Sequence, residues 1–114
     1  MARPRRLGDR SVTRRHAAGL ALGLALPLAA FADELGRKVF TEAAQPPCAL
    51  CHTLEAAGAT GTIGPSLDEL KPDKARVLEV VRTGIGVMPR FAGQLSDQQI
   101  EAVADFVSKA VLGR

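Results

Sequence analysis

The stretch Cys48-Ala49-Leu50-Cys51-His52 decides the fold of this chain. It holds the only two cysteines among the 114 residues, and a histidine follows the second cysteine directly. Residues three positions apart on a helical turn share a face, so both sulfur atoms are expected on the same side. His52 then follows at the end of that turn. The spacing predicts that these three side chains act on one bound group.

The pattern C-x-x-C-H is the attachment signature of a c-type haem. The two thiols would reach the vinyl groups on one porphyrin edge, and His52 would lie under the iron. Three other interpretations stay open at this point. A zinc site needs four nitrogen or sulfur ligands, but the other histidine, His16, lies in a segment expected to be removed. A thiol-disulfide motif needs a strand pattern that this chain lacks, and a chance match in a structural helix is the third.

The first 32 residues have the features of a secretory signal peptide. An apolar stretch from Ala17 to Ala30 follows a positively charged segment, and Ala30-Phe31-Ala32 is a small-x-small cleavage site. We expect cleavage after Ala32 and residence of the mature protein, residues 33–114, in the periplasm. The basic residues of the charged segment are Arg3, Arg5, Arg6, Arg10, Arg14 and Arg15.

Two alternatives to this simple export signal are less favoured. The apolar stretch is shorter than the about 20 residues of a membrane-spanning helix and contains Pro27, so no stable membrane anchor is expected. Thr13-Arg14-Arg15 resembles a twin-arginine signal. The general secretory route is favoured because small residues, Ala17 and Ala18, stand where that signal has larger apolar ones.

Removal of the leader reverses the charge of the chain. The full sequence has 15 basic and 12 acidic residues, of which the leader holds 6 and 1. Residues 33–114 therefore carry 9 basic and 11 acidic side chains, a net charge of −2. The basic balance of the full sequence belongs to the leader, so no nucleic-acid partner is expected.

Residues 33–114 form one domain of 82 residues, whose apolar core would be marginal alone. Helices are expected at about 33–44, 73–84 and 97–111, because apolar residues recur there at helical spacing. Prolines and glycines end the first two, and Ser96 with Gln99 predicts a capping box for the third. Residues 53–70 are expected to be mostly loop, with only a short helical turn after Cys48. With no strand pattern, the sequence predicts an all-α domain.

The order of these motifs resembles the small monohaem class I cytochromes c. The resemblance implies the cytochrome c fold, in which N- and C-terminal helices cross and haem forms the core. It implies that Cys48 and Cys51 form thioethers to one haem c, with His52 as proximal and Met88 as distal iron ligand. The carbonyl of Pro65 would accept a hydrogen bond from His52 Nδ1 and orient the ring. The other matching residues are Gly36, Phe40, Gly64, Ser66, Leu67, Pro89 and Phe106.

The same resemblance predicts the walls of the haem pocket. Leu67 would line it, together with Ile85, Val87 and Phe91. The chain has no Trp or Tyr, so side chains that often bind the haem propionates are missing. Plain solvation of the propionates is the favoured expectation, with Arg90 or Lys71 as substitute partners in the alternative.

A His/Met pair would fill both axial positions of the iron, which suits outer-sphere electron transfer better than catalysis. We expect a non-enzymatic carrier of single electrons from a dehydrogenase to a terminal oxidase or another cytochrome. The loops between the motifs resemble cytochromes that accept electrons from bacterial molybdenum sulfite dehydrogenases. An open-site haem enzyme or gas sensor, and a permanent haem subunit of an oxidoreductase, remain as alternatives.

Overall fold

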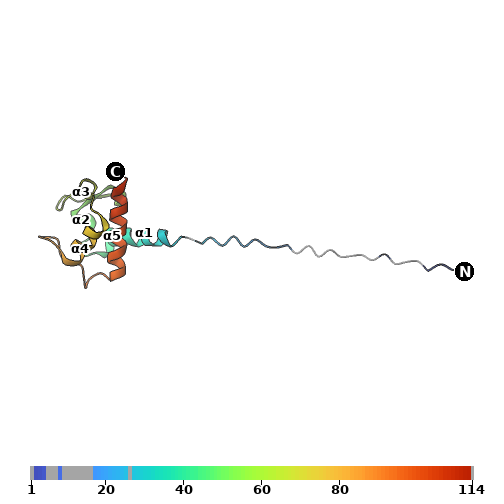
Figure 1. Ribbon diagram of the computed structural model, residues 1–114. Helices are drawn as coiled ribbons and strands as arrows, with labels where there is room; N and C mark the ends of the chain where they lie inside the picture. The colour runs from blue at the N-terminus through green and yellow to red at the C-terminus, as the bar shows by residue number, and fades with distance from the viewer. Residues whose placement is uncertain (1, 5–7, 9–16, 26, 114) are drawn as a thin grey trace.

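Short loops connect a set of helices that gather around the C-terminal helix (Figure 1). The computed structural model describes residues 2–4, 8, 17–25 and 27–113, so Arg5, Arg6, Arg10, Arg14, Arg15 and His16 lie outside the described residues. The elements in chain order are α1 Leu28–Lys38, the π-helix η1 Val39–Ala43, α2 Cys48–Cys51, β1 Thr53–Leu54, the 3-10 helix η2 Glu55–Ala57, β2 Ala59–Thr60, α3 Leu67–Leu70, α4 Lys74–Thr83 and α5 Asp97–Leu112.

Residues 17–25 have neither helix nor strand and lead away from the folded part of the chain (Figure 1). Among the helices that the structure describes, none has the length and apolar character needed to cross a membrane.

The first helix begins earlier than the sequence predicts. α1 starts at Leu28 instead of Asp33, so the predicted start is wrong. Pro27 at the N-cap directs the chain into the helix, and the Leu and Ala residues after it are strong helix formers. Residues 28–31 are exposed, and Gly36 is the first buried residue of α1. The extra turn therefore lengthens the helix without adding to the core.

α1 crosses α5 where glycine allows close approach. A Cβ at Gly36 would lie 2.5 Å from Phe106 Cβ and would also overlap the Ala102 carbonyl oxygen. The Phe106 ring meets Phe40 edge-on with centroids 6.2 Å apart, and the Arg37 guanidinium lies 5.4 Å from its centroid. The predicted crossing of the terminal helices is confirmed (Figure 1).

Residues 53–70 contain more regular structure than the sequence predicts. β1 and β2 pair antiparallel, with Thr53 opposite Thr60, and Gly58 turns the chain with a φ of 62°. α3 follows, with the Ser66 hydroxyl accepting from the Glu69 amide at 3.4 Å. The expectation of a loop with only the turn at α2 is wrong here, because strands of two residues are too short to show an alternating pattern. The domain is nevertheless mainly helical, so the all-α class is confirmed.

α4 and α5 have the ends that the sequence predicts. Asp73 caps α4, with its carboxylate accepting from the Arg76 amide at 2.8 Å. At α5 the Ser96 hydroxyl accepts from the Gln99 amide at 3.1 Å, while the Gln99 side-chain oxygen accepts from the Ser96 amide at 2.9 Å. The predicted capping box is thereby confirmed. Such caps stabilise a helix by about 1 kcal/mol each, because they satisfy amides that the helix leaves unpaired.

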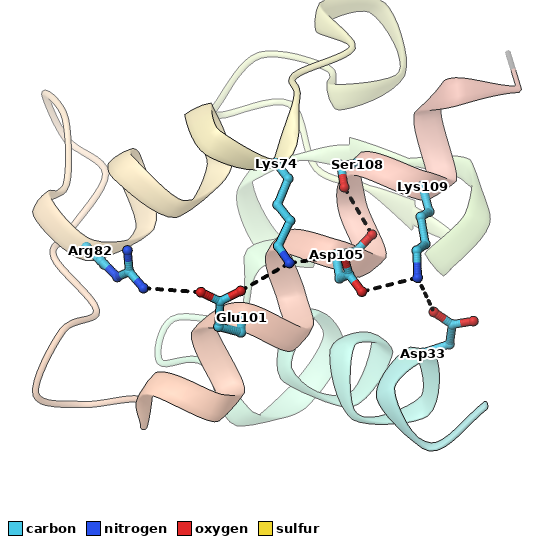
Figure 2. A network of polar contacts seen from close by, with 7 residues as sticks. All are labelled: Asp33, Lys74, Arg82, Glu101, Asp105, Ser108 and Lys109. Atoms are coloured by element: carbon cyan, nitrogen blue, oxygen red, sulfur yellow. Dashed lines mark hydrogen bonds and ion pairs between the residues drawn. The ribbon is translucent and has the colours of Figure 1, made fainter. Parts of the chain in front are cut away.

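Ion pairs join α4 to α5 (Figure 2). Lys74 Nζ lies 3.1 Å from Glu101 Oε2 and 3.3 Å from Asp105 Oδ1. Arg82 reaches the other oxygen of Glu101 at 3.5 Å. The contacts with Glu101 and then Asp105 raise the pKa of Lys74. Both carboxylates are thus matched by cations across the helix pair.

Lys109 extends this network to α1 (Figure 2). Its ammonium group lies 3.1 Å from Asp105 Oδ2 and 4.0 Å from Asp33 Oδ1. Lys109 first, and Lys74 next, lower the pKa of the Asp105 carboxyl group, so Asp105 is charged at neutral pH. These exposed pairs contribute little energy individually, and their main effect is to fix how the three helices pair.

We expect Gly36→Ala to destabilise the holoprotein by about 1–3 kcal/mol, because the added methyl group has no space between α1 and α5. Guanidinium chloride unfolding monitored by circular dichroism measures the loss. Gly113→Ala is the matched control, since a Cβ there meets nothing within 4 Å. Equal stability of the two variants would contradict the conclusion that α1 and α5 leave no space for a side chain at position 36.

Candidate functional site

α2 presents the two cysteines on one helical turn. Pro47 precedes the turn, and the chain leaves it at His52 with an extended backbone, φ −115° and ψ 136°. Cys48 and Cys51 are partly buried, line the same cavity and form no disulfide. Burial raises the pKa of the Cys48 thiol to about 11. This shift is opposite to the thiolate activation that a thiol-disulfide redox motif needs, so that interpretation loses support.

The His52 ring is held by the segment that follows β2. Its Nδ1 lies 2.7 Å from the carbonyl oxygen of Pro65. A carbonyl oxygen can only accept a hydrogen bond, so Nδ1 carries the proton and donates it. The lone pair of Nε2 is then available to a metal ion, which is the usual arrangement of a ligating histidine.

Gly64 lies directly against the imidazole ring of His52. A Cβ at position 64 would lie 2.6 Å from His52 Cε1 and 2.9 Å from Nδ1. The absence of a side chain therefore lets the backbone of the Gly64-Pro65 segment pass directly against the imidazole. Backbone geometry on this side sets the orientation of the ring.

A tight turn brings Met88 to the cavity. The amides and carbonyls of Ile85 and Met88 bond to each other in both directions, at 3.1 and 2.9 Å. Gly84 and Gly86 have φ values of 72° and 56°, which favour glycine. A Cβ at Gly84 would also lie 2.8 Å from the Met88 carbonyl oxygen. The position of this thioether thus depends on a short hairpin closed by two hydrogen bonds.

All six residues that the sequence assigns to the site, Cys48, Cys51, His52, Pro65, Leu67 and Met88, line one cavity of about 470 Å³. Ile85, Val87 and Phe91 line it as well, whereas Lys71 and Arg90 do not. The α4 residues Arg76, Val77 and Val80 also form part of the wall. Sequence reasoning missed these three, although the helical spacing of Val77 and Val80 could have placed that face inward.

The cavity residues fit a covalently attached haem. Apolar side chains form most of the wall, which suits the body of a porphyrin, and the volume lies in the range of small-molecule sites. Two thiols, a free imidazole nitrogen and a thioether share this one space. Among the described residues, no three His, Cys, Asp or Glu side chains gather as a metal-binding group, so the zinc interpretation finds no further ligands there.

Residues 32–107 match the family model described as cytochrome c oxidase, cbb3-type, subunit III. The chain belongs to this family of c-type cytochromes. It is also similar to the crystal structure of the c-type cytochrome SorU from Sinorhizobium meliloti, with 51% sequence identity and a TM-score of 0.69. That match covers 72% of this chain and 93% of the SorU chain. No curated relative matches this chain.

Family membership confirms the predicted resemblance to small c-type cytochromes and the predicted cytochrome c fold. Proteins of this kind hold haem covalently, and they generally carry electrons instead of catalysing reactions. Covalent haem c is therefore the type of cofactor that belongs to this cytochrome.

We expect Gly64→Ala to push the His52 ring from its position and to destabilise the holoprotein by about 1–3 kcal/mol, because the new methyl group would overlap the imidazole. The absorption spectrum and the thermal melting of the purified holoprotein measure both effects. Gly113→Ala is the matched control, since a Cβ there meets nothing within 4 Å and Gly113 does not line the cavity. A Gly64→Ala protein with the spectrum and stability of this control would argue against the close contact.

Proposed function

We propose that this cytochrome carries single electrons through one haem c, attached by Cys48 and Cys51 and ligated by His52 and Met88. The observation that carries the proposal is the meeting of an imidazole with a free Nε2 and a thioether in one apolar cavity. Haem bound there supplies a couple between ferric and ferrous iron. The single C-x-x-C-H motif in the sequence supports a count of one haem.

His52 and Met88 make this site suited to electron transfer. The Pro65 carbonyl fixes the ring and increases the basicity of Nε2, which favours a strong bond to iron. The soft thioether of Met88 favours the ferrous state and raises the reduction potential. If His52 and Met88 both bound the iron, they would leave no free ligand position for a substrate, which suits electron transfer.

Export to the periplasm is part of the proposal. The leader pattern of residues 1–32 supports it, and so does the packing of α1. Every residue from Leu28 to Phe31 is exposed, and the first buried position is Gly36. Cleavage after Ala32 would remove these exposed residues and the half-buried Ala32, and it would leave Gly36 and its contact with α5 in place.

Met88→Ala tests the assignment as a carrier. We expect the reduced wild type not to bind carbon monoxide and the variant to bind it readily, because loss of the thioether opens one axial position. Difference spectra under carbon monoxide measure the binding. Leu67→Ala is the control, because it shortens another side chain of the cavity wall without removing the thioether. If wild type binds carbon monoxide as strongly as Met88→Ala, an open-site haem enzyme or sensor becomes the better assignment.

We further propose a molybdenum sulfite dehydrogenase as the electron donor. The loop motifs support this partner, as does the 51% identity to the c-type cytochrome SorU. Among the exposed apolar side chains that line the cavity are four large aliphatic ones, Ile63, Leu70, Ile85 and Val87, and we call these four the mouth patch. An exposed apolar patch marks an interaction site, and a small one suits the short encounters of redox partners.

Val87→Lys tests the mouth patch as the docking surface. Val87 is 92% exposed, so the change should preserve the fold while lowering the rate of reduction by sulfite dehydrogenase several-fold, since it places a charge in an apolar contact. Stopped-flow reduction of the oxidised holoprotein measures the rate. Leu112→Lys is the matched control, because Leu112 is 82% exposed at the end of α5 and does not line the cavity. Equal rates would place docking elsewhere, and a wild type that this enzyme does not reduce would exclude the donor.

A further inference from the structure

We propose that Arg76 pairs with a carboxylate of the bound haem at the α4 side of the cavity and thereby raises the reduction potential. The inference rests on the proposed function, because it needs haem in the cavity. Arg76 would take the role of propionate partner that the sequence analysis considers for Lys71 and Arg90.

The first argument is the charge of the cavity wall. Among the described residues that line the cavity, Arg76 is the one that carries a permanent charge. The porphyrin has two propionate groups, and an anion at an apolar wall is costly without a partner. Arginine is the side chain best suited to a carboxylate, because its planar fork can donate two parallel hydrogen bonds.

The second argument is the position of the side chain. Arg76 lines the cavity while its side chain is 53% exposed, so this residue borders both the cavity and the solvent. This is where a charged group at the rim of an apolar macrocycle would reach water. The backbone of Arg76 is fixed by the cap of α4, with its amide donating to Asp73 Oδ1 at 2.8 Å. The start of α4 thus fixes the backbone that carries this cation.

The third argument is the capacity of the guanidinium. Its Nη1 donates to Glu79 Oε2 at 3.0 Å. That contact uses one of the five N–H donors, so the fork can also serve a second carboxylate. Glu79 is itself 64% exposed, so this contact leaves the arginine accessible.

The other two cations are less well placed. Lys71 ends α3 with a φ of 47° and does not line the cavity. Arg90 follows Pro89 on the chain that leaves the Met88 turn, and it does not line the cavity either. Arg76 alone of these three combines a charge with a place on the wall.

Midpoint potentials of the purified holoproteins test the proposal. We expect Arg76→Gln to lower the potential and Arg76→Lys to retain most of it, because a cation near the haem favours the reduced state, which carries one more negative charge. Arg82→Gln is the matched control. It removes an arginine of similar exposure, 44%, from the same helix, and Arg82 does not line the cavity.

Three results would overturn the assignment. These are an unchanged potential in Arg76→Gln, a fall no larger than that of Arg82→Gln, and an equal fall in Arg76→Lys. If Arg76→Gln does not retain haem, Glu79→Gln is measured instead. We then expect the potential to rise more in Glu79→Gln than in Glu101→Gln. An equal rise in the two variants, or no rise, would overturn the proposal. The haemochrome spectrum of the wild type comes first. Absence of covalent haem there overturns the proposed function together with this inference, whereas unchanged potentials overturn the inference alone.

Discussion

The hydrophobic core of this protein and the walls of its cavity share residues, and the rest of the structure depends on this. Phe40, Val77, Phe91, Val103 and Val107 are buried in the core and also line the cavity. The apolar core of a domain of this size is marginal alone, so a group that fills the cavity would complete the packing of these side chains. A bound haem therefore has a structural role as well as a redox role.

The helices that surround this cavity were predictable because each carries its own local signals. The capping box of Ser96 and Gln99 acts within one turn of sequence, and the structure forms it as expected. Gly36 could also be recognised, since the crossing with α5 requires a residue without a side chain. Local signals also explain the error at the N-terminus, where Pro27 and the helix formers after it start α1 at Leu28.

The remaining features depend on contacts between segments that are distant in sequence. β1 and β2 have two residues each, so their pairing leaves no pattern that periodicity could detect. The closeness of Gly64 to the His52 ring is visible only when the two segments are folded together. The place of Arg76 on the cavity wall could not be predicted either. Helical spacing tells which residues share a face of α4, but it does not tell which neighbouring segment that face meets. The C-x-x-C-H motif predicts which group is bound, whereas the residues of the cavity wall could be identified only from the structure.

The two faces of α4 explain how one short helix serves both stability and the site. Lys74 and Arg82 pair with the carboxylates of α5, and no residue of the ion-pair network in Figure 2 lines the cavity. Arg76, Val77 and Val80 instead form part of the cavity wall. The cations of the network are already matched by Glu101 and Asp105, so their charges are largely compensated where they lie. Arg76 contacts an exposed glutamate of its own helix, a pair that is weak in water. Of the three cations on α4, Arg76 is thus the one that lies beside the cavity and the one whose partner is on its own helix instead of on α5.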